Sequence, residues 1–258
     1  MRLPAKASRR RFLARATATT GALALSGCDA LSQTGWFRRV LATGETLSET
    51  TQKLLTPRKA LAQEFSVADR SPEFRHNGSY MPDSAEYEAL AARDFVAYRL
   101  QVGGLVGKPA SFSLAELRAL PSRTQTTRHD CIEGWSAIGT WKGAKLSALL
   151  DLVEPRPEAR YVMFYCADTL QDNGPPYYES IDFDDAFHPQ TILAYELNDR
   201  VLPIQNGAPI RLRVERQLGY KHAKYIMRIE LVERFDHIAG GTGGFWEDDQ
   251  GYEWYAGI

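Results

Sequence analysis

The chain has 258 residues, of which 44% are hydrophobic and 24% are charged, and this composition is typical of a globular protein with ample material for a core. Its length suits one large domain or two small ones. The formal net charge of −1 gives no basis for nucleic-acid binding, so we expect no nucleic-acid partner.

Residues 1–27 have the features of an export signal. Residues 8–13 (SRRRFL) match a twin-arginine signal, and the apolar run at 16–25 is too short to span a bilayer as an anchor. Residues 25–28 (LSGC) are similar to a bacterial lipobox, which would make Cys28 the lipidated first residue; a plain signal peptide with an unrelated cysteine is the alternative. We therefore expect a periplasmic protein that a lipid anchor holds to the inner membrane.

Loss of this signal would change the charge and the cysteine count. Residues 1–27 contain six Lys or Arg and no acid, so the remaining chain has 25 cations against 32 anions, a net charge of −7. An acidic protein needs a local basic cluster to hold an anionic ligand. Besides Cys28 the chain has Cys131 and Cys166, and in an oxidising compartment a disulfide between them is one alternative. A metal ligand is the other, because twin-arginine export carries proteins that have already folded, usually around a cofactor.

Residues 28–69 form the next segment, which we predict to be a tether or a surface helix. Apolar residues between 36 and 55 are separated by Arg and Glu, so the pattern fits a helix on the membrane or on the domain and equally a solvated linker. Pro57 interrupts this segment. We assign the compact domain to residues 70–258.

The first part of that domain predicts strands and short helices. Residues 98–109 alternate apolar and polar residues before a glycine-rich turn, as a strand does. Residues 113–116 (SLAE) form a capping-box pattern that opens a short helix, which Pro121 ends. Residues 143–153 predict a second helix with leucines on one face.

Strands dominate the rest of the domain. Residues 159–168 form a mostly apolar run typical of a buried strand, and residues 191–203 predict a hairpin around an Asn-Asp turn. Apolar residues alternate with Arg and Glu at 209–215, and residues 224–235 predict a final strand. Strands with short, irregularly interspersed helices indicate an α+β fold with mixed β-sheets.

Residues 240–258 combine several glycines with five aromatic residues. Glycines let the backbone turn freely, and the aromatic side chains can cover apolar surface. We expect an aromatic C-terminal arm that packs on the domain, with an exposed patch for a partner as the alternative.

Cys131, in the segment RHDCIEGWS (128–136), is the first candidate for chemistry. A loop thiol can be a nucleophile, half of a disulfide, a metal ligand or a small buried group. Zinc is weakly supported, because His129 lies near but no CxxC motif or second histidine pair accompanies it. A thiol nucleophile would need an activating histidine, and His129, His188 and His222 are equal candidates.

Residues 206–224 (NGAPIRLRVERQLGYKHAK) concentrate positive charge, since six of them are Arg, Lys or His. Gly207 and Gly219 would let a ligand approach the backbone closely. Cationic side chains and accessible amides at a tight turn suit a bound phosphate. The alternative is a strand whose outward residues happen to be cationic, and the acidic balance of the rest of the chain favours the phosphate.

Three segments together resemble the molybdenum-cofactor domain of the sulfite oxidase family. They are residues 131–136 (CIEGWS), 175–203 (PPYYESIDFDDAFHPQTILAYELNDRVLP) and 206–226 (NGAPIRLRVERQLGYKHAKYI), in the family's order. The resemblance covers about residues 70–240 and is greatest to small exported bacterial members without a haem domain, among which are reductases of methionine sulfoxide. It implies a sulfite oxidase-type molybdopterin-binding fold, a molybdenum-molybdopterin cofactor and no haem.

The resemblance also implies roles for single residues. Cys131 would be the protein thiolate on molybdenum, a soft and strongly donating ligand. Tyr177, Glu133 and Asn77 would be the catalytic residues at the open side of the metal. The alternatives are Tyr178 in place of Tyr177, a loop carboxylate paired with a nearby lysine for Glu133, and a plain core cysteine for Cys166. The residues expected to bind the cofactor are Asn77, Tyr80, Cys131, Cys166, Asn206, Arg211, His222, Ala223 and Lys224.

Two departures from the family pattern decide the reaction that we expect. An arginine that sulfite oxidases use for their anionic substrate is out of register here, at Arg75, and we expect no counterpart of the family's C-terminal immunoglobulin-like dimerisation domain. We therefore expect oxygen-atom transfer that reduces an S- or N-oxide, with oxidation of sulfite by a cytochrome acceptor as the alternative. Electrons would pass through a membrane-bound or soluble electron-transfer protein, a cytochrome or a quinone-linked subunit. A lipoprotein that binds ligands without redox chemistry, and a cysteine hydrolase with Cys131 and His129, are alternatives from other classes.

Overall fold

The computed structural model describes residues 34–171 and 174–258. The export signal and Cys28 lie outside these residues, so the twin-arginine and lipobox assignments stay predictions. The chain divides into two compact units, Met1–Leu55 and Thr56–Ile258. The candidate site belongs entirely to the second unit.

The described part of the first unit is helix α2 (Gly35–Leu55), which lies in the segment predicted as a tether or a surface helix. It ends two residues before Pro57, in agreement with the predicted interruption. Large apolar side chains such as Trp36, Leu47 and Leu54 are exposed on it. Nowhere in the described chain is a helix both long enough and apolar enough to cross a membrane.

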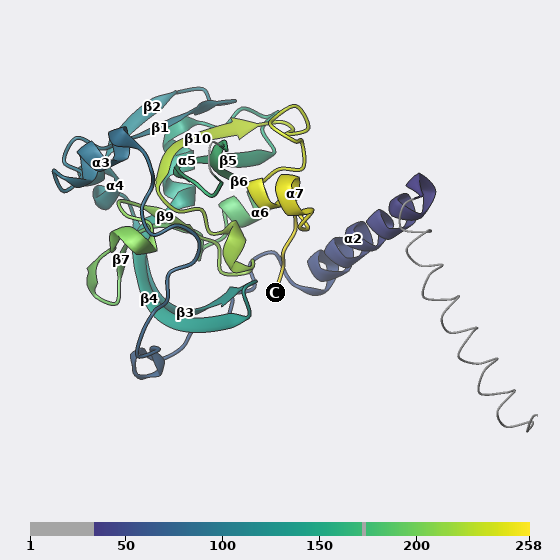
Figure 1. Cartoon of the computed structure of the whole chain (residues 1–258), viewed down its shortest axis with the longest axis horizontal. Coiled ribbons are helices and arrows are strands. Elements are labelled where there is room, and N and C mark those ends of the chain that lie inside the picture. Colours follow the sequence, from purple (N-terminus) through teal and green to yellow (C-terminus); the bar gives the residue numbers. More distant parts are fainter. Residues whose placement is uncertain (1–33, 172–173) are drawn as a thin grey trace, which may run out of the picture. The chain divides into compact units, whose positions relative to one another are not determined.

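The second unit has the α+β organisation that the sequence predicted, with short helices between strands (Figure 1). Its strands are β1 (Arg99–Gly104), β2 (Ala110–Ser113), β3 (Ser122–Cys131), β4 (Trp135–Lys145), β5 (Tyr161–Thr169), β6 (Pro176–Asp182), β7 (Ile192–Leu197), β8 (Arg200–Val201), β9 (Arg211–Arg213) and β10 (Ile226–Val232). Its helices are η1 (Val67–Asp69), α3 (Ala85–Ala91), α4 (Leu114–Ala119), α5 (Leu146–Val153), α6 (Phe183–Ala186), η2 (Ile204–Asn206), η3 (Gly219–Lys221) and α7 (Phe245–Gln250).

The strands form two sheets. The mixed sheet has the order β2-β1-β10-β5-β6, in which β1 and β10 run parallel and the other neighbours antiparallel. The antiparallel sheet has the order β3-β4-β7-β8, with β9 paired to β7. Figure 1 shows β3 and β4 as a long curved hairpin. Cys131 is the last residue of β3, so this hairpin carries the predicted metal ligand at its turn.

Side chains from both sheets and α5 form the main core. Leu100 of β1, Phe164 of β5, Leu149 of α5 and Leu212 of β9 are fully buried in one hydrophobic cluster. Apolar burial of this extent is the dominant favourable contribution to folding. A smaller cluster around Trp141 lies on the antiparallel sheet.

Local signals predicted several elements correctly. Ser113 and Glu116 exchange both capping-box hydrogen bonds at the start of α4. Asn198 and Asp199 form the β7–β8 turn with φ values of 51° and 63°, as a tight hairpin requires. The predicted helix at 143–153 starts later, at Leu146, because the preceding residues complete strand β4.

One domain boundary and the exposure of one strand differ from expectation. The compact unit starts at Thr56, before the boundary predicted at residue 70, because the intervening segment bonds to the body of the unit. The Ala62 amide donates to Gln190 at 2.8 Å, and the Phe65 amide donates to the Thr126 carbonyl at 2.8 Å. In addition, the alternation at 209–215 predicts one exposed face, yet Arg211 and Arg213 are 0% exposed. Both faces of β9 are therefore covered.

The C-terminal arm packs on the second unit, as the preferred interpretation of its glycines and aromatic residues predicts. Phe245 of α7 is buried in the main core, and the Leu218 amide donates to the Ala256 carbonyl at 2.9 Å. The arm therefore supplies side chains to the same region as the basic segment.

Candidate active site

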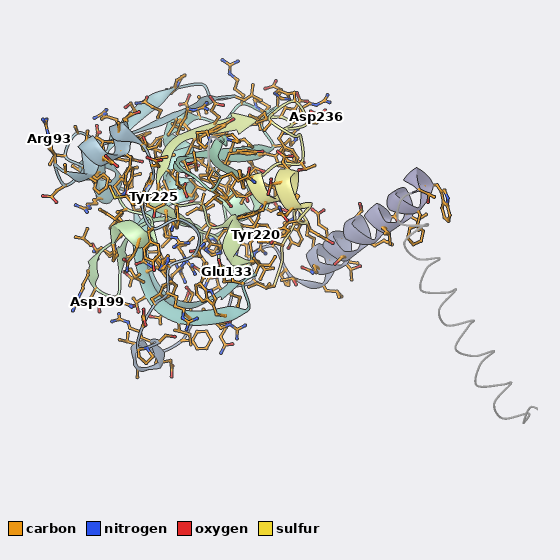
Figure 2. All side chains as sticks on the ribbon, in the orientation of Figure 1. Arg93, Glu133, Asp199, Tyr220, Tyr225 and Asp236 are labelled. Atoms are coloured by element: carbon orange, nitrogen blue, oxygen red, sulfur yellow. The ribbon has the colours of Figure 1, made fainter. Side chains whose placement is uncertain are left out.

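One cavity, of about 150 Å³, brings together side chains from the Cys131 turn, the basic segment and the C-terminal arm. Figure 2 labels two of the residues around it, Glu133 and Tyr220. The lining residues are Asn77, Gly78, Cys131, Ile132, Glu133, Asp168, Leu170, Tyr177, Tyr220, His222, Lys224, Trp246 and Tyr252. Six of the residues predicted from the sequence are in this set: Asn77, Cys131, Glu133, Tyr177, His222 and Lys224.

Cys131 reaches the cavity because the β3–β4 hairpin turns directly after it. The Gly134 amide donates to the Cys131 carbonyl at 3.0 Å, and Gly134 has a φ of 87°, a conformation that favours glycine. Burial raises the pKa of the Cys131 thiol, and a backbone hydrogen bond from Glu133 offsets only part of this rise. Cys131 is half-buried, and a thiol of this kind loses its proton when a metal binds it. Cys131 and Cys166 are both free, so the disulfide alternative is wrong.

The predicted catalytic residues meet at this cavity from three separate segments. Glu133, in the hairpin turn, is exposed, and the Trp135 indole donates to it at 2.9 Å. The two lysines that could have paired with Glu133 are Lys142 and Lys145. Lys142 instead forms an ion pair with Glu196, and Lys145 forms none with Glu133. Tyr177 of β6 is 6% exposed and its hydroxyl donates to the Tyr220 carbonyl at 2.5 Å. Asn77 lies in the loop before α3, and its backbone carbonyl accepts a hydrogen bond from the Lys224 ammonium at 2.7 Å.

The basic segment folds so that its cations point inward. Gly207 has a φ of 110°, and an added Cβ there would lie 3.0 Å from the Cβ of Arg211 and 3.1 Å from the Cβ of Lys224. A side chain at Gly207 would therefore push these two cations apart. Arg211 stacks over Trp141, with its guanidinium carbon 5.2 Å from the ring centre.

Arg211 and Lys224 have no carboxylate partner in the described chain. Arg211 donates to the Asn206 carbonyl at 3.0 Å, and Lys224 donates to the Ser79 carbonyl at 2.6 Å. Burial, and then the charge of Arg213, lowers the pKa of Arg211 to about 9. Burial, and then the charge of Arg211, lowers the pKa of Lys224 to about 7. Two buried cations whose hydrogen-bond partners in the described chain are all neutral groups are an unfavourable arrangement, which a bound anion would relieve.

Several polar atoms beside these cations are buried without a hydrogen-bond partner in the described chain, namely Asn206 Nδ2, Arg211 Nε, His222 Nδ1 and Asp168 Oδ1. The first two are donors. Burial, and then Arg213, holds the pKa of His222 well below its usual value, so the ring is neutral. Its Nε2 lies 3.0 Å from the Gln217 carbonyl and must donate to it, which leaves Nδ1 as an acceptor. Since buried polar atoms are normally satisfied, these donors and acceptors fit a ligand with both an anionic group and polar ring atoms.

A phosphorylated pterin has those properties, and Cys131 supplies a sulfur at the same cavity. Among the residues that the structure describes, no group of three or more His, Cys, Asp or Glu side chains is placed to hold a metal ion. A metal bound to Cys131 would therefore take most of its ligands from outside the protein. The pterin dithiolene of a molybdenum cofactor provides such sulfur ligands. The residues present thus fit this cofactor.

Five predicted cofactor residues do not line the cavity. Arg211, Asn206 and Ala223 are buried behind it, where the first two present the unsatisfied atoms described above. Tyr80 is 66% exposed, with its ring against His76, and lies outside the lining. Cys166 is 5% exposed in β5 and belongs to the main core. Cofactor contact by Tyr80 or Cys166 thus gains no support from the geometry.

Sequence reasoning missed seven of the lining residues. Asp168 and Leu170 lie at the end of β5, and Trp246 and Tyr252 come from the C-terminal arm. The aromatic content of that arm was a usable signal, but it indicated packing and did not indicate which surface the arm covers. Gly78 and Ile132 are immediate neighbours of predicted residues, and Tyr220, which completes the set, lies two positions before His222.

Comparison with known proteins assigns the family. The model of a family described as the oxidoreductase molybdopterin binding domain matches residues 88–237. A putative protein-methionine-sulfoxide reductase subunit, YedZ1, from Azospira oryzae is 36% identical over 250 residues, which cover 97% of this chain and 88% of that protein.

Other relatives match over shorter stretches. The protein-methionine-sulfoxide reductase catalytic subunits MsrP of Ralstonia nicotianae and Xanthomonas axonopodis pv. citri are each 38% identical, over 53% and 61% of this chain. The chain spans about half the length of these two, 44% and 50%. The sulfane dehydrogenase SoxCD from Paracoccus pantotrophus aligns with a TM-score of 0.49 and 24% identity over 54% of this chain and 39% of that one. The family resemblance of the three sequence segments is confirmed, and the chain belongs to the molybdopterin-binding oxidoreductases of the sulfite oxidase family.

Proposed function

We propose that this protein reduces an S-oxide, of the class of methionine sulfoxide, by oxygen-atom transfer at a molybdenum cofactor bound to Cys131. The three relatives reported above are named as subunits of protein-methionine-sulfoxide reductases, which supports this substrate class. The proposal includes the absence of haem. When bound, the cofactor would supply the two-electron redox change of the reaction.

The character of the cavity wall is the observation that carries this choice. The lining residues include two acids, Glu133 and Asp168, and one cation, Lys224, but no arginine. Apolar and aromatic side chains such as Leu170 and Trp246 form much of the rest. Such a wall disfavours a sulfite dianion and suits an uncharged polar group on an apolar body. A neutral sulfoxide fits this description, and an N-oxide is the related alternative.

The chain's own residues would bind and orient the substrate. The Asn77 side-chain amide can donate a hydrogen bond to the sulfoxide oxygen, and the Tyr177 hydroxyl can do so once its proton turns from the Tyr220 carbonyl. Glu133 borders the side of the cavity next to Cys131. Ile132, Leu170 and the aromatic arm would cover the methyl groups of the substrate and exclude water. Asn206, Arg211, His222, Ala223 and Lys224 would hold the pterin and its phosphate.

The cellular setting is part of the proposal. Export by the twin-arginine route, a periplasmic location and a lipid anchor on Cys28 rest on the sequence of residues 1–28. All three relatives reported above are named as subunits, which supports an electron-transfer partner for this chain, either membrane-bound or soluble. The partner would deliver electrons singly from a cytochrome or a quinone-linked protein.

The test compares two substrates on protein purified from a molybdenum-replete host. Methionine sulfoxide with a reduced viologen dye should be turned over, while sulfite with a cytochrome acceptor should give no rate above background. Turnover of sulfite alone would overturn the proposal. Metal analysis should find molybdenum in the wild-type protein and not in Cys131→Ala, with circular dichroism to check that the variant folds. A wild-type protein without molybdenum would favour the non-redox lipoprotein, and molybdenum-independent hydrolysis that alkylation stops would favour the hydrolase.

A further inference from the structure

A second buried ionic cluster lies next to the cavity, and the cofactor assignment does not use it. The Lys221 ammonium donates to Glu179 at 2.5 Å and to Glu247 at 2.6 Å. All three side chains are at most 1% exposed. They come from η3, β6 and α7, so three distant segments of the chain meet at one ammonium group. We call these three residues the acid cluster.

The acid cluster has one more carboxylate than cation. With all groups ionised it would hold a net charge of −1 in a region without water contact, which is costly. The two carboxylates also crowd each other, because an added Cβ on Gly244 would lie 2.2 Å from Glu247 and 2.7 Å from Glu179. One proton shared between the carboxylates makes the cluster neutral. The cluster is therefore expected to hold an extra proton at neutral pH.

The electrostatic surroundings agree with that proton. Burial, followed by the charge of Glu247, raises the pKa of Glu179 well above its usual value, against the effect of Lys221. Burial lowers the pKa of Lys221, but the two carboxylates more than offset this and raise it. Lys221 therefore stays charged while a carboxyl is protonated. The other ionisable groups that act on Glu179 or are acted on by it are Tyr177 and Tyr178 of β6, Tyr220 of η3 and Cys166 of β5.

Tyr177 connects the acid cluster to the cavity. Its hydroxyl lies 3.5 Å from the free carboxyl oxygen of Glu179, Oε2, and 2.5 Å from the Tyr220 carbonyl. The same residue lines the cavity beside Cys131. The Tyr177 oxygen can therefore accept a proton from the cluster on one side, while its own proton turns from the Tyr220 carbonyl to a bound substrate on the other. Burial and Glu179 raise the pKa of Tyr177 well above its usual value, so it passes a proton on without becoming a stable phenolate.

We propose that the acid cluster is a proton store that delivers a proton through Tyr177 to the oxygen removed from the substrate. This rests on the proposed function. Reduction of a sulfoxide breaks the S–O bond, reduces sulfur by two electrons and forms water, so it consumes two protons. The electrons come from the external electron-transfer protein by way of the cofactor. One proton moves from Glu179 to the Tyr177 oxygen while Tyr177 gives its own to the departing oxygen; solvent supplies the second proton and later refills the store.

A purely structural role is the competing explanation, because the Lys221–Glu247 pair also ties α7 to the unit. Glu247→Gln separates the two, since glutamine keeps the size of the side chain and a hydrogen bond to Lys221 while it removes the surplus negative charge. Lys221 and Glu179 would then form a neutral ion pair with no stored proton. Asp249→Asn is the matched control, because Asp249 is an exposed carboxylate on the same helix.

The first readout is the infrared absorption of a protonated carboxylic acid in the wild-type holoenzyme near neutral pH. It should be present in wild type and in Asp249→Asn, and absent in Glu247→Gln. The second readout is the pH profile of sulfoxide reduction. Wild-type kcat should fall as pH rises through the raised pKa of the cluster, and Glu247→Gln should lower kcat about tenfold or more at neutral pH with KM unchanged. Tyr177→Phe should keep the infrared band and lose kcat.

The outcomes are distinct. A wild-type protein without the carboxylic-acid band would overturn the proton store, and so would a Glu247→Gln variant with unchanged kcat and pH profile. A higher KM and a lower thermal stability in Glu247→Gln, with kcat and its pH profile unchanged, would show that the cluster is structural. Absence of sulfoxide turnover in wild type would contradict the proposed function, while the band and its loss in Glu247→Gln would still decide whether the store exists.

Discussion

Two pairs of cations in the basic segment look equivalent in the sequence but are treated differently by the fold. Arg213 binds the Glu215 carboxylate through two hydrogen bonds, of 2.9 and 2.6 Å, and Lys221 binds two carboxylates. Arg211 and Lys224 are buried as deeply, yet they have carbonyl oxygens and Asn77 as partners. The first pair is therefore neutralised within the protein, and the second pair is not.

This difference identifies which cations serve the structure and which await a ligand. Burying a charge is costly unless it is paired, so a fold keeps an unpaired buried cation only where something compensates it. Arg213 and Lys221 need nothing more than the chain provides. Arg211 and Lys224, with the unsatisfied atoms around them, supply the positive charge that an anionic cofactor requires.

Removal of a cation from the neutralised pair should have the largest effect on folding. Arg213→Met leaves the Glu215 carboxylate buried with Gln125 as its remaining donor, so we expect the free energy of unfolding to fall by about 3–5 kcal/mol. Denaturant unfolding measures this change. The double variant Arg213→Met/Glu215→Leu should recover most of it, because no charge is then left unpaired. An equal loss in both variants would mean that Arg213 acts through packing on Trp141, 4.5 Å from its guanidinium carbon.

Removal of a cation from the other pair should have the opposite sign in the cofactor-free protein. Arg211→Met takes away an unpaired buried charge, so the cofactor-free protein should be at least as stable as wild type. The holoenzyme should lose about 1.5–3 kcal/mol of binding, a tenfold to hundredfold weaker hold on the cofactor. Molybdenum and pterin content after dilution and dialysis measure the loss. Arg128→Gln, at an exposed cation near Cys131, is the control and should change neither quantity.

The sequence predicted the elements whose cause is local. The capping box of α4 and the Asn198-Asp199 turn follow from single residues and their immediate neighbours. Cys131 and the basic segment were brought together by the family resemblance alone, since nothing in their spacing selects a partner. Alternation indicated a strand within residues 209–215, where β9 covers Arg211–Arg213, but it could not show that Trp141 and His129 cover the polar face.

The missing parts of the site share one physical reason. Asp168 stands at the end of a mostly apolar strand, and Trp246 and Tyr252 lie far along the chain in the aromatic C-terminal arm, whose composition predicts packing but not the surface that it covers. Their place in the cavity depends on where the C-terminal arm docks, which is a property of the packed core and of the Lys221–Glu247 contact. Pairing of distant charges decides which cation is available, and a one-dimensional pattern does not record it.

The smallest expected effect, and the most specific, is the pH dependence of anion binding to the cofactor-free protein. Because the pKa of Lys224 is lowered to about 7, this side chain loses its charge as pH rises through that value, while Lys221, whose pKa is raised, keeps its charge. Sulfate remains a dianion over this range, so its affinity should fall by at most about tenfold per pH unit above 7. Titration calorimetry on either side of pH 7 measures it.

Protein stability should change in the other direction over the same range, which separates this effect from general unfolding. Between about 7 and the unfolded pKa of a lysine, about 10.4, the unfolded chain still binds a proton that the folded chain has released. The free energy of unfolding therefore rises with pH while sulfate affinity falls. Lys224→Met should bind sulfate weakly at every pH and show neither slope. If wild-type sulfate affinity is independent of pH, Lys224 is paired after all, and the distinction between the two pairs of cations fails.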